Sequence, residues 1–292
     1  MTQDWNVGML LGVSSAYWRG CAMQAAVRLK IFSVIGNKAM RAADIADEAS
    51  TNARATELLL DALSAMGLLS KTGHTYTNTD FSRIHLHEAS SEYMGHIILH
   101  HHHVLDGWAQ LDKAVCTGKK IDKRSYGEDI ERESFLLGMF NLAKGIAPQI
   151  AASIDLTGYK KLLDLGGGPG TYAIHFCKEN PDLEAVIFDR PTTEPIAAKV
   201  VASHNLSDRI SFEGGDFNTS SPTKNSFDVA WLSHILHSNS YEECERCIQK
   251  TAEALTPGGL LLVHDFILNS AKDGPEFPAL FSLNMLVGTD EG

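Results

Sequence analysis

The sequence predicts an α/β fold in which a mainly helical first half precedes a mostly parallel sheet. From Lys161 onward, strand-like apolar segments alternate with helix-like segments, which is typical of a parallel sheet covered by helices. The first of these strands runs into the glycine-rich turn 165–170. The first 150 residues read as helices with one short hairpin. Because ligands of such sheets bind beyond the carboxyl ends of the strands, we expect a crevice at the glycine-rich turn.

The second half is expected to contain five strands and three main helices. The predicted strands are 161–166, 183–189, 210–215, 227–234 and 259–266, and the predicted helices lie near 170–179, 192–203 and 241–255. Ser240 and Glu243 have the spacing of a capping box, and Thr256-Pro-Gly-Gly is expected to end that helix. The residues that follow strand ends, and should share one rim, are Gly166, Asp189, Asp216 and His237.

The first half contains a predicted helix-turn-helix with a wing, formed by helices 43–49 and 53–66 and the hairpin 67–76. Such units often bind DNA, but residues 41–80 carry three basic against six acidic side chains. Phosphates would be repelled, so contact with another subunit is favoured. The expected domains are 1–105, the linking helices 106–155 that line the pocket, and 156–292.

Composition favours a small-molecule ligand. The 292 residues include 25 Lys plus Arg and 36 Asp plus Glu, a net charge of −11, which argues against nucleic acid and anionic membranes. Five scattered cysteines and the lack of a signal segment predict a cytoplasmic, reduced protein. Cys244-x-x-Cys247 and the run 100–103 of four histidines are interpreted as helix faces, so no metal is expected.

The spacing of the glycines distinguishes between nucleoside ligands. A dinucleotide fingerprint beginning at Gly166 would require its third glycine at Thr171, whereas the chain shows Asp164-x-Gly166-x-Gly168-x-Gly170. This pattern resembles motif I of S-adenosylmethionine-dependent methyltransferases, whose ligand has no pyrophosphate. Asp164 would accept hydrogen bonds from the aminoacyl end of the ligand. Asp189, 19 residues after Gly170, would bind the ribose, with a helix N-cap as the alternative.

Further segments extend this resemblance over nearly the whole chain. With Leu29-Lys-Ile-Phe32, the segment 63–69 and Gly214-Gly-Asp216-Phe217, the chain resembles the two-domain small-molecule O-methyltransferases of plant phenolic, bacterial hydroxyneurosporene and polyketide type. The resemblance implies a Rossmann-like class I methyltransferase domain and an N-terminal winged-helix domain that forms a homodimer. It also implies S-adenosylmethionine as cofactor and S-adenosylhomocysteine as product. Asp216 would then bind the adenine amino group, and Phe217 would pack on the ring.

The resemblance also places a catalytic histidine within Trp231-Leu-Ser-His-Ile-Leu-His237. A phenol or similar hydroxyl, with a pKa of ~10, is a poor nucleophile while protonated. Imidazole, with a pKa of ~6.5, can take the proton as the oxygen attacks. His237 is the expected base and Asp265 its partner. His234 is the competing candidate, although a histidine at the end of a buried strand more often serves packing.

Several positions depart from the family or match it weakly. Ser233 replaces a family lysine at an expected cofactor contact, and Ser238-Asn239 replace Asp-Trp, so a stacking contact on adenine is expected to be lost or supplied elsewhere. Met139 and Asn284 match positions beside the substrate. The sequence stops at Gly292, where the family continues into a helix and hairpin that complete a seven-stranded sheet, so a fragment or truncated chain is expected.

The expected activity is methyl transfer from S-adenosylmethionine to a hydroxyl of a small aromatic, polyketide or polyene acceptor. A relative that binds the same cofactor but catalyses decarboxylation or hydroxylation is the first alternative. A ligand-sensing winged-helix regulator is the second, which the acidic helix-turn-helix disfavours.

Overall fold

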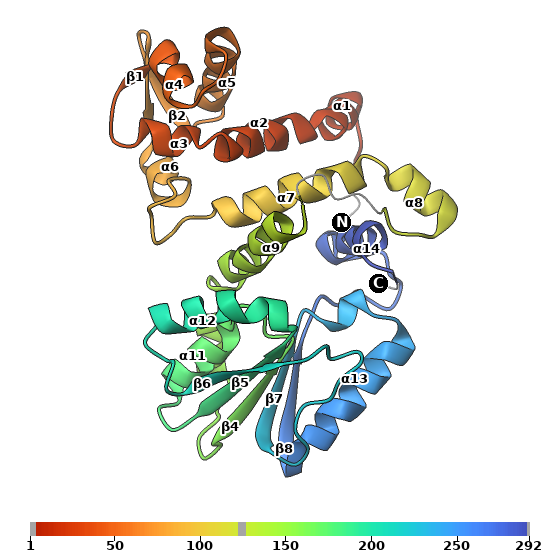
Figure 1. Cartoon of the computed structure of the whole chain (residues 1–292). Coiled ribbons are helices and arrows are strands. Elements are labelled where there is room, and N and C mark those ends of the chain that lie inside the picture. The colour runs from red at the N-terminus through yellow and green to blue at the C-terminus, as the bar shows by residue number, and fades with distance from the viewer. Residues whose placement is uncertain (1–3, 122–126, 291–292) are drawn as a thin grey trace. The chain divides into compact units, whose positions relative to one another are not determined.

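The computed structural model describes residues 4–121 and 127–290 (Figure 1). The chain divides into two compact units, Met1–His103 and Val104–Gly292. The first is mainly helical and the second contains a five-stranded parallel sheet, so the predicted α/β class is confirmed.

The first unit is built from helices around a small antiparallel sheet. Its helices are α1 (Val7–Ser15), α2 (Tyr17–Arg28), α3 (Ile31–Ile35), α4 (Ala42–Glu48), α5 (Ala53–Ala65), α6 (Asp80–His85) and α7 (Gly95–Trp108), the last of which continues into the second unit. Its strands are β1 (Met40–Arg41), β2 (Leu69–Thr72) and β3 (Thr75–Asn78). The expected helix-turn-helix is present as α4 and α5, and the hairpin as β2 and β3, with β1 added on the other side of β3.

Local sequence explains this unit. Asn52 caps α5 by accepting a hydrogen bond from the Ala55 N–H, which satisfies one of the free donors at the helix start. The helix then buries Leu60 and Leu63 completely and exposes its opposite face, as an amphipathic surface helix does.

The second unit wraps its sheet in helices. The helices are α8 (Leu111–Thr117), α9 (Glu128–Ala143), α10 (Ala147–Ser153), α11 (Thr171–Glu179), α12 (Glu194–Ser203), α13 (Tyr241–Ala254) and α14 (Glu276–Gly288), with short 3-10 turns η1 (Pro191–Thr193) and η2 (Leu236–Ser238). The strands are β4 (Lys161–Leu165), β5 (Glu184–Asp189), β6 (Ile210–Gly214), β7 (Phe227–Ser233) and β8 (Leu255–His264).

The central strands β4, β5 and β7 are buried on both faces, which explains their largely apolar sequences, whereas the edge strands β6 and β8 are partly exposed. Leu162 and Trp231 point to the face covered by α10, α11 and α12, while Leu163 and Leu232 point to the face covered by α13. The predicted capping box of α13 is confirmed, because the Ser240 and Glu243 side chains each accept from the other's backbone N–H.

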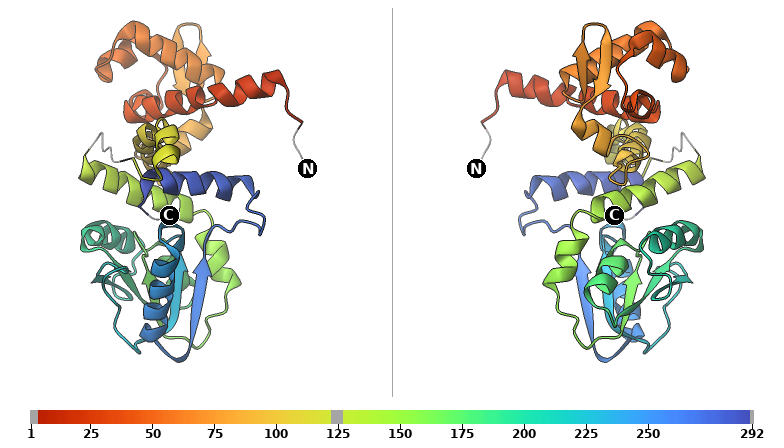
Figure 2. Two further views of the ribbon diagram at one scale, coloured as in Figure 1. Left: turned by 90° about the vertical axis from the view of Figure 1, so that its right-hand side faces the viewer. Right: turned by 90° about the vertical axis from the view of Figure 1, so that its left-hand side faces the viewer.

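The strand order β6-β5-β4-β7-β8 positions the site, because all neighbours are parallel and the order reverses between β4 and β7. Such a reversal opens a crevice beyond the carboxyl ends of the two central strands. The glycine-rich turn follows β4, and the segment with His234 and His237 follows β7. Figures 1 and 2 show α9 and α14 of the same unit lying beyond this end of the sheet.

Several predicted strand bounds differ from the structure by a residue or more, and the last two strands show why. The last strand was expected at 259–266, but β8 begins at Leu255, immediately after α13, and passes a register irregularity before ending at His264. Thr256-Pro-Gly-Gly therefore lies inside the strand. The strand 227–234 ends one residue earlier, because His234 has a left-handed backbone with φ of 56°.

Among the described residues, no single helix is long and apolar enough to cross a membrane. The bent pair α9 and α10 meets the length and composition criteria together.

Candidate active site

The glycine-rich turn needs glycine for two separate reasons. Gly166 and Gly170 have φ of 65° and 80°, a region that disfavours other residues. A Cβ at Gly166 would lie 2.6 Å from Ile235 Cγ2, and one at Gly170 would lie 2.4 Å from Ile187 Cδ1. At Gly168, with φ of 54°, the nearest described atom to an ideal Cβ is Leu136 Cδ2 of α9, at 3.9 Å. The side of Gly168 on which a Cβ would lie is thus open.

Asp164 lies beneath this turn and is 1% exposed. Its Oδ2 accepts from the Ala173 N–H at 3.2 Å, and a Cβ at Gly167 would be 2.6 Å from its Cγ. Burial raises the pKa of Asp164 to about 7, the charge of Asp189 adds to this effect, and the Ala173 hydrogen bond opposes it. The carboxyl group supports the turn from below, and its direct contact with a ligand stays a prediction.

Asp189 links the tips of two strands. Its Oδ2 accepts from the Gly168 N–H at 2.8 Å, and its Oδ1 accepts from the Arg190 N–H and the Thr193 hydroxyl. The alternative role as a cap of the following turn is therefore also present. The half-buried carboxylate thus lies next to the glycine-rich turn, and its contact with a ribose hydroxyl stays a prediction.

Asp216 and Phe217 follow β6 on the same rim. Oδ1 of Asp216 accepts from the Asn218 N–H at 2.9 Å, which tightens the turn. The Phe217 ring comes within 3.4 Å of an ideal Cβ at Gly166, so the ring and the glycine-rich turn are neighbours. The structure therefore brings these predicted residues together, although it does not test their contacts with a cofactor.

His237 and Asp265, the predicted base and its partner, lie in direct contact. Nδ1 of His237 lies 2.6 Å from Oδ1 of Asp265, and the His237 backbone N–H donates to the other carboxylate oxygen at 3.3 Å. Burial by itself raises the pKa of Asp265, but the two neighbouring histidines and the Phe266 N–H hold the pKa of Asp265 well below its usual range. An ionised carboxylate on Nδ1 fixes the tautomer in which Nε2 accepts a proton.

His234 was expected to serve packing or to compete with His237 as the base, and the choice between these roles stays a prediction. Its Nδ1 is buried, has no hydrogen-bond partner and lies 3.7 Å from Oδ1 of Asp265, too far for a hydrogen bond. The left-handed backbone lifts the ring out of the strand, against the rings of His264 and Phe266 at 4.7 Å.

The side chains of His234, His237 and Asp265 offer ligand atoms within 4.8 Å of one another, a spacing that can accommodate a divalent ion. The short contact between His237 and Asp265 is, however, the geometry of a hydrogen-bonded pair. The absence of a metal requirement stays a prediction.

Ser233 lies beside residues that sequence reasoning missed. Its hydroxyl lies 3.1 Å from Nδ1 of His264, which is also 3.5 Å from the Tyr172 hydroxyl, and the His264 ring stacks on Trp231. Burial, and then the neighbouring His234, lower the pKa of His264. No sequence motif signalled this cluster, because its members come from α11, β7 and β8.

A pocket of about 220 Å³ opens beside His237. Its other lining residues are Phe266, Leu268, Pro278, Phe281, Ser282 and Met285. Neither Met139 nor Asn284 is among them: Met139 is half-buried on α9, and Asn284 accepts a hydrogen bond from the Trp108 indole at 2.8 Å. Their roles beside a substrate stay predictions.

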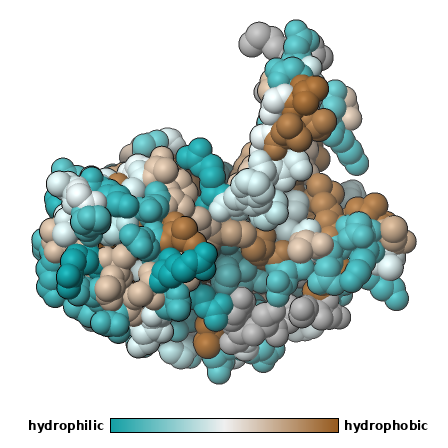
Figure 3. Space-filling model, turned by 90° about the horizontal axis from the view of Figure 1, so that it is seen from above, coloured by the Kyte–Doolittle hydropathy of each residue, from teal (hydrophilic) through white to brown (hydrophobic). Residues whose placement is uncertain are grey.

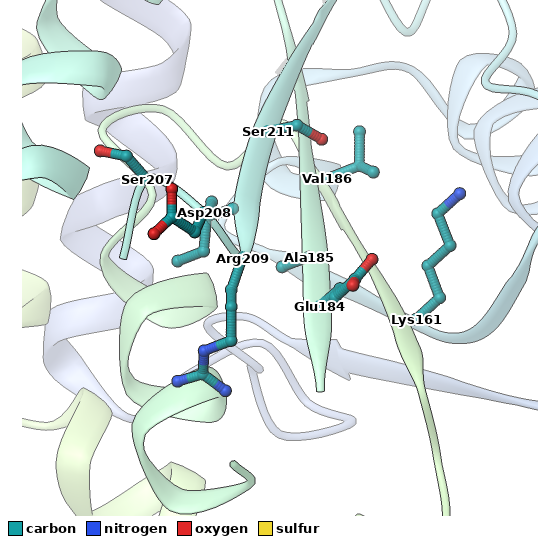
Figure 4. A pocket seen from close by; sticks show the side chains of 9 residues that line it. Lys161, Glu184, Ala185, Val186, Ser207, Asp208, Arg209 and Ser211 are labelled. Atoms are coloured by element: carbon teal, nitrogen blue, oxygen red, sulfur yellow. The ribbon is translucent and has the colours of Figure 1, made fainter. Parts of the chain in front are cut away.

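Another pocket, of about 180 Å³, lies at the opposite end of the strands (Figure 4). It is lined by Lys161 and Glu184, the first residues of β4 and β5, and by Arg209, which precedes β6. The Arg209 guanidinium is occupied by carbonyl groups, including those of Cys177 and Pro181. None of the predicted site residues lines this pocket, so we assign it no part in the chemistry.

Comparison with known proteins identifies the family. Residues 101–292 match the O-methyltransferase domain, and residues 11–88 match the O-methyltransferase dimerisation domain. The chain belongs to the O-methyltransferase family. Its relatives include the tetracenomycin polyketide synthesis 8-O-methyl transferase TcmO of Streptomyces glaucescens. The two sequences are 32% identical over an alignment that covers 98% of this chain and 86% of the relative. The 3-hydroxy-5-methyl-1-naphthoate 3-O-methyltransferase of Streptomyces sahachiroi is 29% identical over an alignment that covers 96% of this chain and 83% of the relative.

Among solved structures, that of PigF with SAH is 25% identical, with a TM-score of 0.90 over 99% of this chain and 89% of that chain. The protein is therefore an S-adenosylmethionine-dependent O-methyltransferase. The residues present fit this cofactor: the open side of Gly168 lies on a rim with the carboxylates of Asp189 and Asp216 and the ring of Phe217, and diphosphate-binding glycine spacing is absent from the sequence.

Proposed function

We propose that this O-methyltransferase acts on a phenolic hydroxyl of a polyketide-type or other small aromatic acceptor, with His237 as general base. The proposal rests chiefly on the 2.6 Å contact between His237 and Asp265 at the mouth of an aromatic pocket. The two relatives named above act on a polyketide and on a hydroxynaphthoate, which supports the same acceptor class.

S-adenosylmethionine supplies a methyl group activated by a sulfonium centre. The protein's own contribution is positioning and proton removal. Asp265 accepts the Nδ1 proton of His237, so that the free Nε2 faces the acceptor hydroxyl and takes its proton as the oxygen attacks. Phe266 and Phe281, whose rings lie 6.1 and 4.9 Å from that of His237, form apolar walls for a flat acceptor.

For the cofactor we propose that Asp189 binds the ribose hydroxyls and that Asp216 and Phe217 bind the adenine. Gly166 and Gly168 would allow close approach of backbone, while Asp164 and Ser233 would contact or support the aminoacyl end. These assignments follow the order of the side chains along the rim, from β6 through β4 to β7.

The test is a panel of phenolic, polyketide and polyene acceptors incubated with methyl-labelled S-adenosylmethionine, with products analysed by mass and by the position of the label. We expect one added methyl group on oxygen. A product that lost carbon dioxide or gained oxygen would place the chain with non-methylating relatives, and transfer to nitrogen would refute the hydroxyl acceptor. A chelator added to the same assay should leave the rate unchanged if no metal takes part.

We further propose a homodimer formed through the first unit. The helix α1 has no buried residue, and its exposed apolar side chains include Val7, Leu10, Leu11 and Val13; Figure 3 shows apolar residues gathered on the arm that this segment forms. The match to a dimerisation domain supports a second copy as the occupant. Light scattering should give twice the chain mass, and Leu11→Glu should shift it toward the monomer.

We also propose a reducing, cytoplasmic location, because all five cysteines are free. Fractionation of the source cells with an antibody tests this proposal.

A further inference from the structure

Two segments of the active site are joined by a pair of asparagine amides. We call residues 216–220, which follow β6, the adenine loop, and residues 235–239, which contain η2 and His237, the base turn. Nδ2 of Asn218 donates to Oδ1 of Asn239 at 3.0 Å, and Nδ2 of Asn239 donates to the Ile235 carbonyl at 2.6 Å. A carbonyl can only accept, so Asn239 must turn its NH₂ toward Ile235 and its oxygen toward Asn218. The direction of both hydrogen bonds is therefore fixed.

The adenine loop is anchored on its other side by α13. Nζ of Lys250 donates to the carbonyls of Asn218 and Ser220 at 2.9 and 3.1 Å, and lies 3.4 Å from that of Phe217. Within the loop, the Asn218 N–H donates to Asp216. Three carbonyls thus converge on one ammonium group that ties the loop to α13, and Asn218 links the same loop to the base turn.

Ile235 is where the base turn meets the cofactor side of the site. Its Cγ2 would be 2.6 Å from a Cβ at Gly166, and the Phe217 ring closes the other side of the same glycine. Ile235 is 6% exposed and precedes His237 by two residues. Its side chain therefore contacts the glycine-rich turn while its carbonyl group binds Asn239, so a shift of the adenine loop reaches the base turn by two routes.

We propose that the Asn218–Asn239 pair is a positioning device that couples occupation of the adenine loop to the orientation of the His237 ring. Neither asparagine touches the reacting atoms. The inference rests on the proposed function, which places adenine at Asp216 and the base at His237.

The test uses S-adenosylhomocysteine as the probe and needs no acceptor. In protein labelled with 13C-histidine, the ring signal of His237 is assigned by its loss in His237→Ala. Saturating S-adenosylhomocysteine should shift this signal in the parent, and the shift should fall below about half in Asn239→Ala and in Asn218→Ala because the link is cut. A shift of parental size in both variants, or no shift in the parent, would overturn the coupling.

Calorimetry provides the second readout. Each single variant should weaken S-adenosylhomocysteine binding by about 3- to 10-fold, the range of one neutral hydrogen bond. The double variant should lose no more affinity than the single variant that loses more, because both substitutions cut the same link. Additive losses would mean that the two residues act separately. Ser238→Ala is the matched control, because its hydroxyl donates to the same Ile235 carbonyl at 3.0 Å but does not bind the adenine loop; it should leave both readouts within about twofold.

The two proposals fail in different ways. If His237→Ala retains parental turnover, the proposed base is wrong, whatever the asparagine variants do. If His237→Ala is inactive while the asparagine variants keep the parental signal shift and additive binding, only the coupling is wrong. Unchanged melting temperatures in the alanine variants would separate positioning from a general loss of packing.

Discussion

The two halves of the active-site rim are constructed differently. At the tips of β4, β5 and β6, the site is made of backbone and of carboxylates on strand ends: Gly166 and Gly170 require left-handed φ, and the Gly168 N–H bonds directly to Asp189. At the tips of β7 and β8, side chains form the site, with His237 held by Asp265 and surrounded by aromatic rings.

Under the proposed function, this difference separates cofactor binding from chemistry. Substituting the strand-end acids that hold a ligand lowers its affinity. Substituting the carboxylate that holds a base lowers the rate of the reaction. The cofactor half should therefore affect affinity for S-adenosylhomocysteine, and the base half should affect turnover. The substitutions below run from the largest expected effect to the smallest; the first three test that separation, and the last tests the burial of Asp164.

Replacing His237 with Ala should lower kcat by ~10²- to 10⁴-fold, the usual contribution of a general base. Affinity for S-adenosylhomocysteine should stay within about threefold, because the ring lies in the base half. Steady-state kinetics and calorimetry measure the two effects. His234→Ala is the matched control, and a loss of kcat as large as that of His237→Ala would reassign the base.

Replacing Asp265 with Asn should lower kcat by ~10- to 100-fold, the free energy of a charge-assisted hydrogen bond expressed as a rate. The neutral amide no longer stabilises the proton on Nδ1, although the pocket keeps its shape. Single-turnover rates at saturating cofactor isolate this effect. Unchanged rates would mean that Asp265 serves only the backbone N–H groups of His237 and Phe266.

Asp189→Ala should weaken S-adenosylhomocysteine binding by ~10-fold and leave kcat at saturating cofactor nearly unchanged, since it removes an acceptor for the ribose and frees the Gly168 N–H. Calorimetry gives the affinity. Asp182→Ala is the control, because that exposed acid pairs with Lys160 near the opposite end of the sheet. Equal losses in both variants would point to net charge as the cause.

Asp164→Asn should make the ligand-free protein more stable than the parent at pH 8, and this gain in stability should be smaller at pH 5. The raised pKa of Asp164, about 7, means that between pH ~4 and 7 the folded state holds a proton that the unfolded state has released. Parental stability therefore falls as the pH rises through this window, by ~1.4 kcal/mol for each pH unit, and the amide removes that loss. Urea unfolding at the two pH values should show a variant-to-parent difference that grows with pH; an equal difference would contradict the assignment.

The accuracy of the sequence predictions follows the same division. Glycine spacing and strand-end acids are local signals, so the turn at 166–170, Asp189 and the α13 capping box were predicted from the sequence and lie where expected. The end of β7 was not, because the left-handed backbone at His234 has no local signal such as a glycine. The start of β8 was also missed, since pairing of Leu255 with Phe227 carries the strand through a Pro-Gly-Gly segment that favours a turn.

By itself, the sequence determined the α/β class, from the alternation of strand-like and helix-like segments, and the glycine-rich turn, because a few neighbouring residues with a fixed conformational preference specify it. The resemblance implied His237 as the base, and that role stays a prediction. Only the tertiary structure decided that Asp265 lies 2.6 Å from His237, that His264 joins Ser233, and that Asn218 reaches Asn239. These pairs are separated by 28, 31 and 21 residues, and their contacts depend on the order and register of parallel strands, which no local pattern specifies.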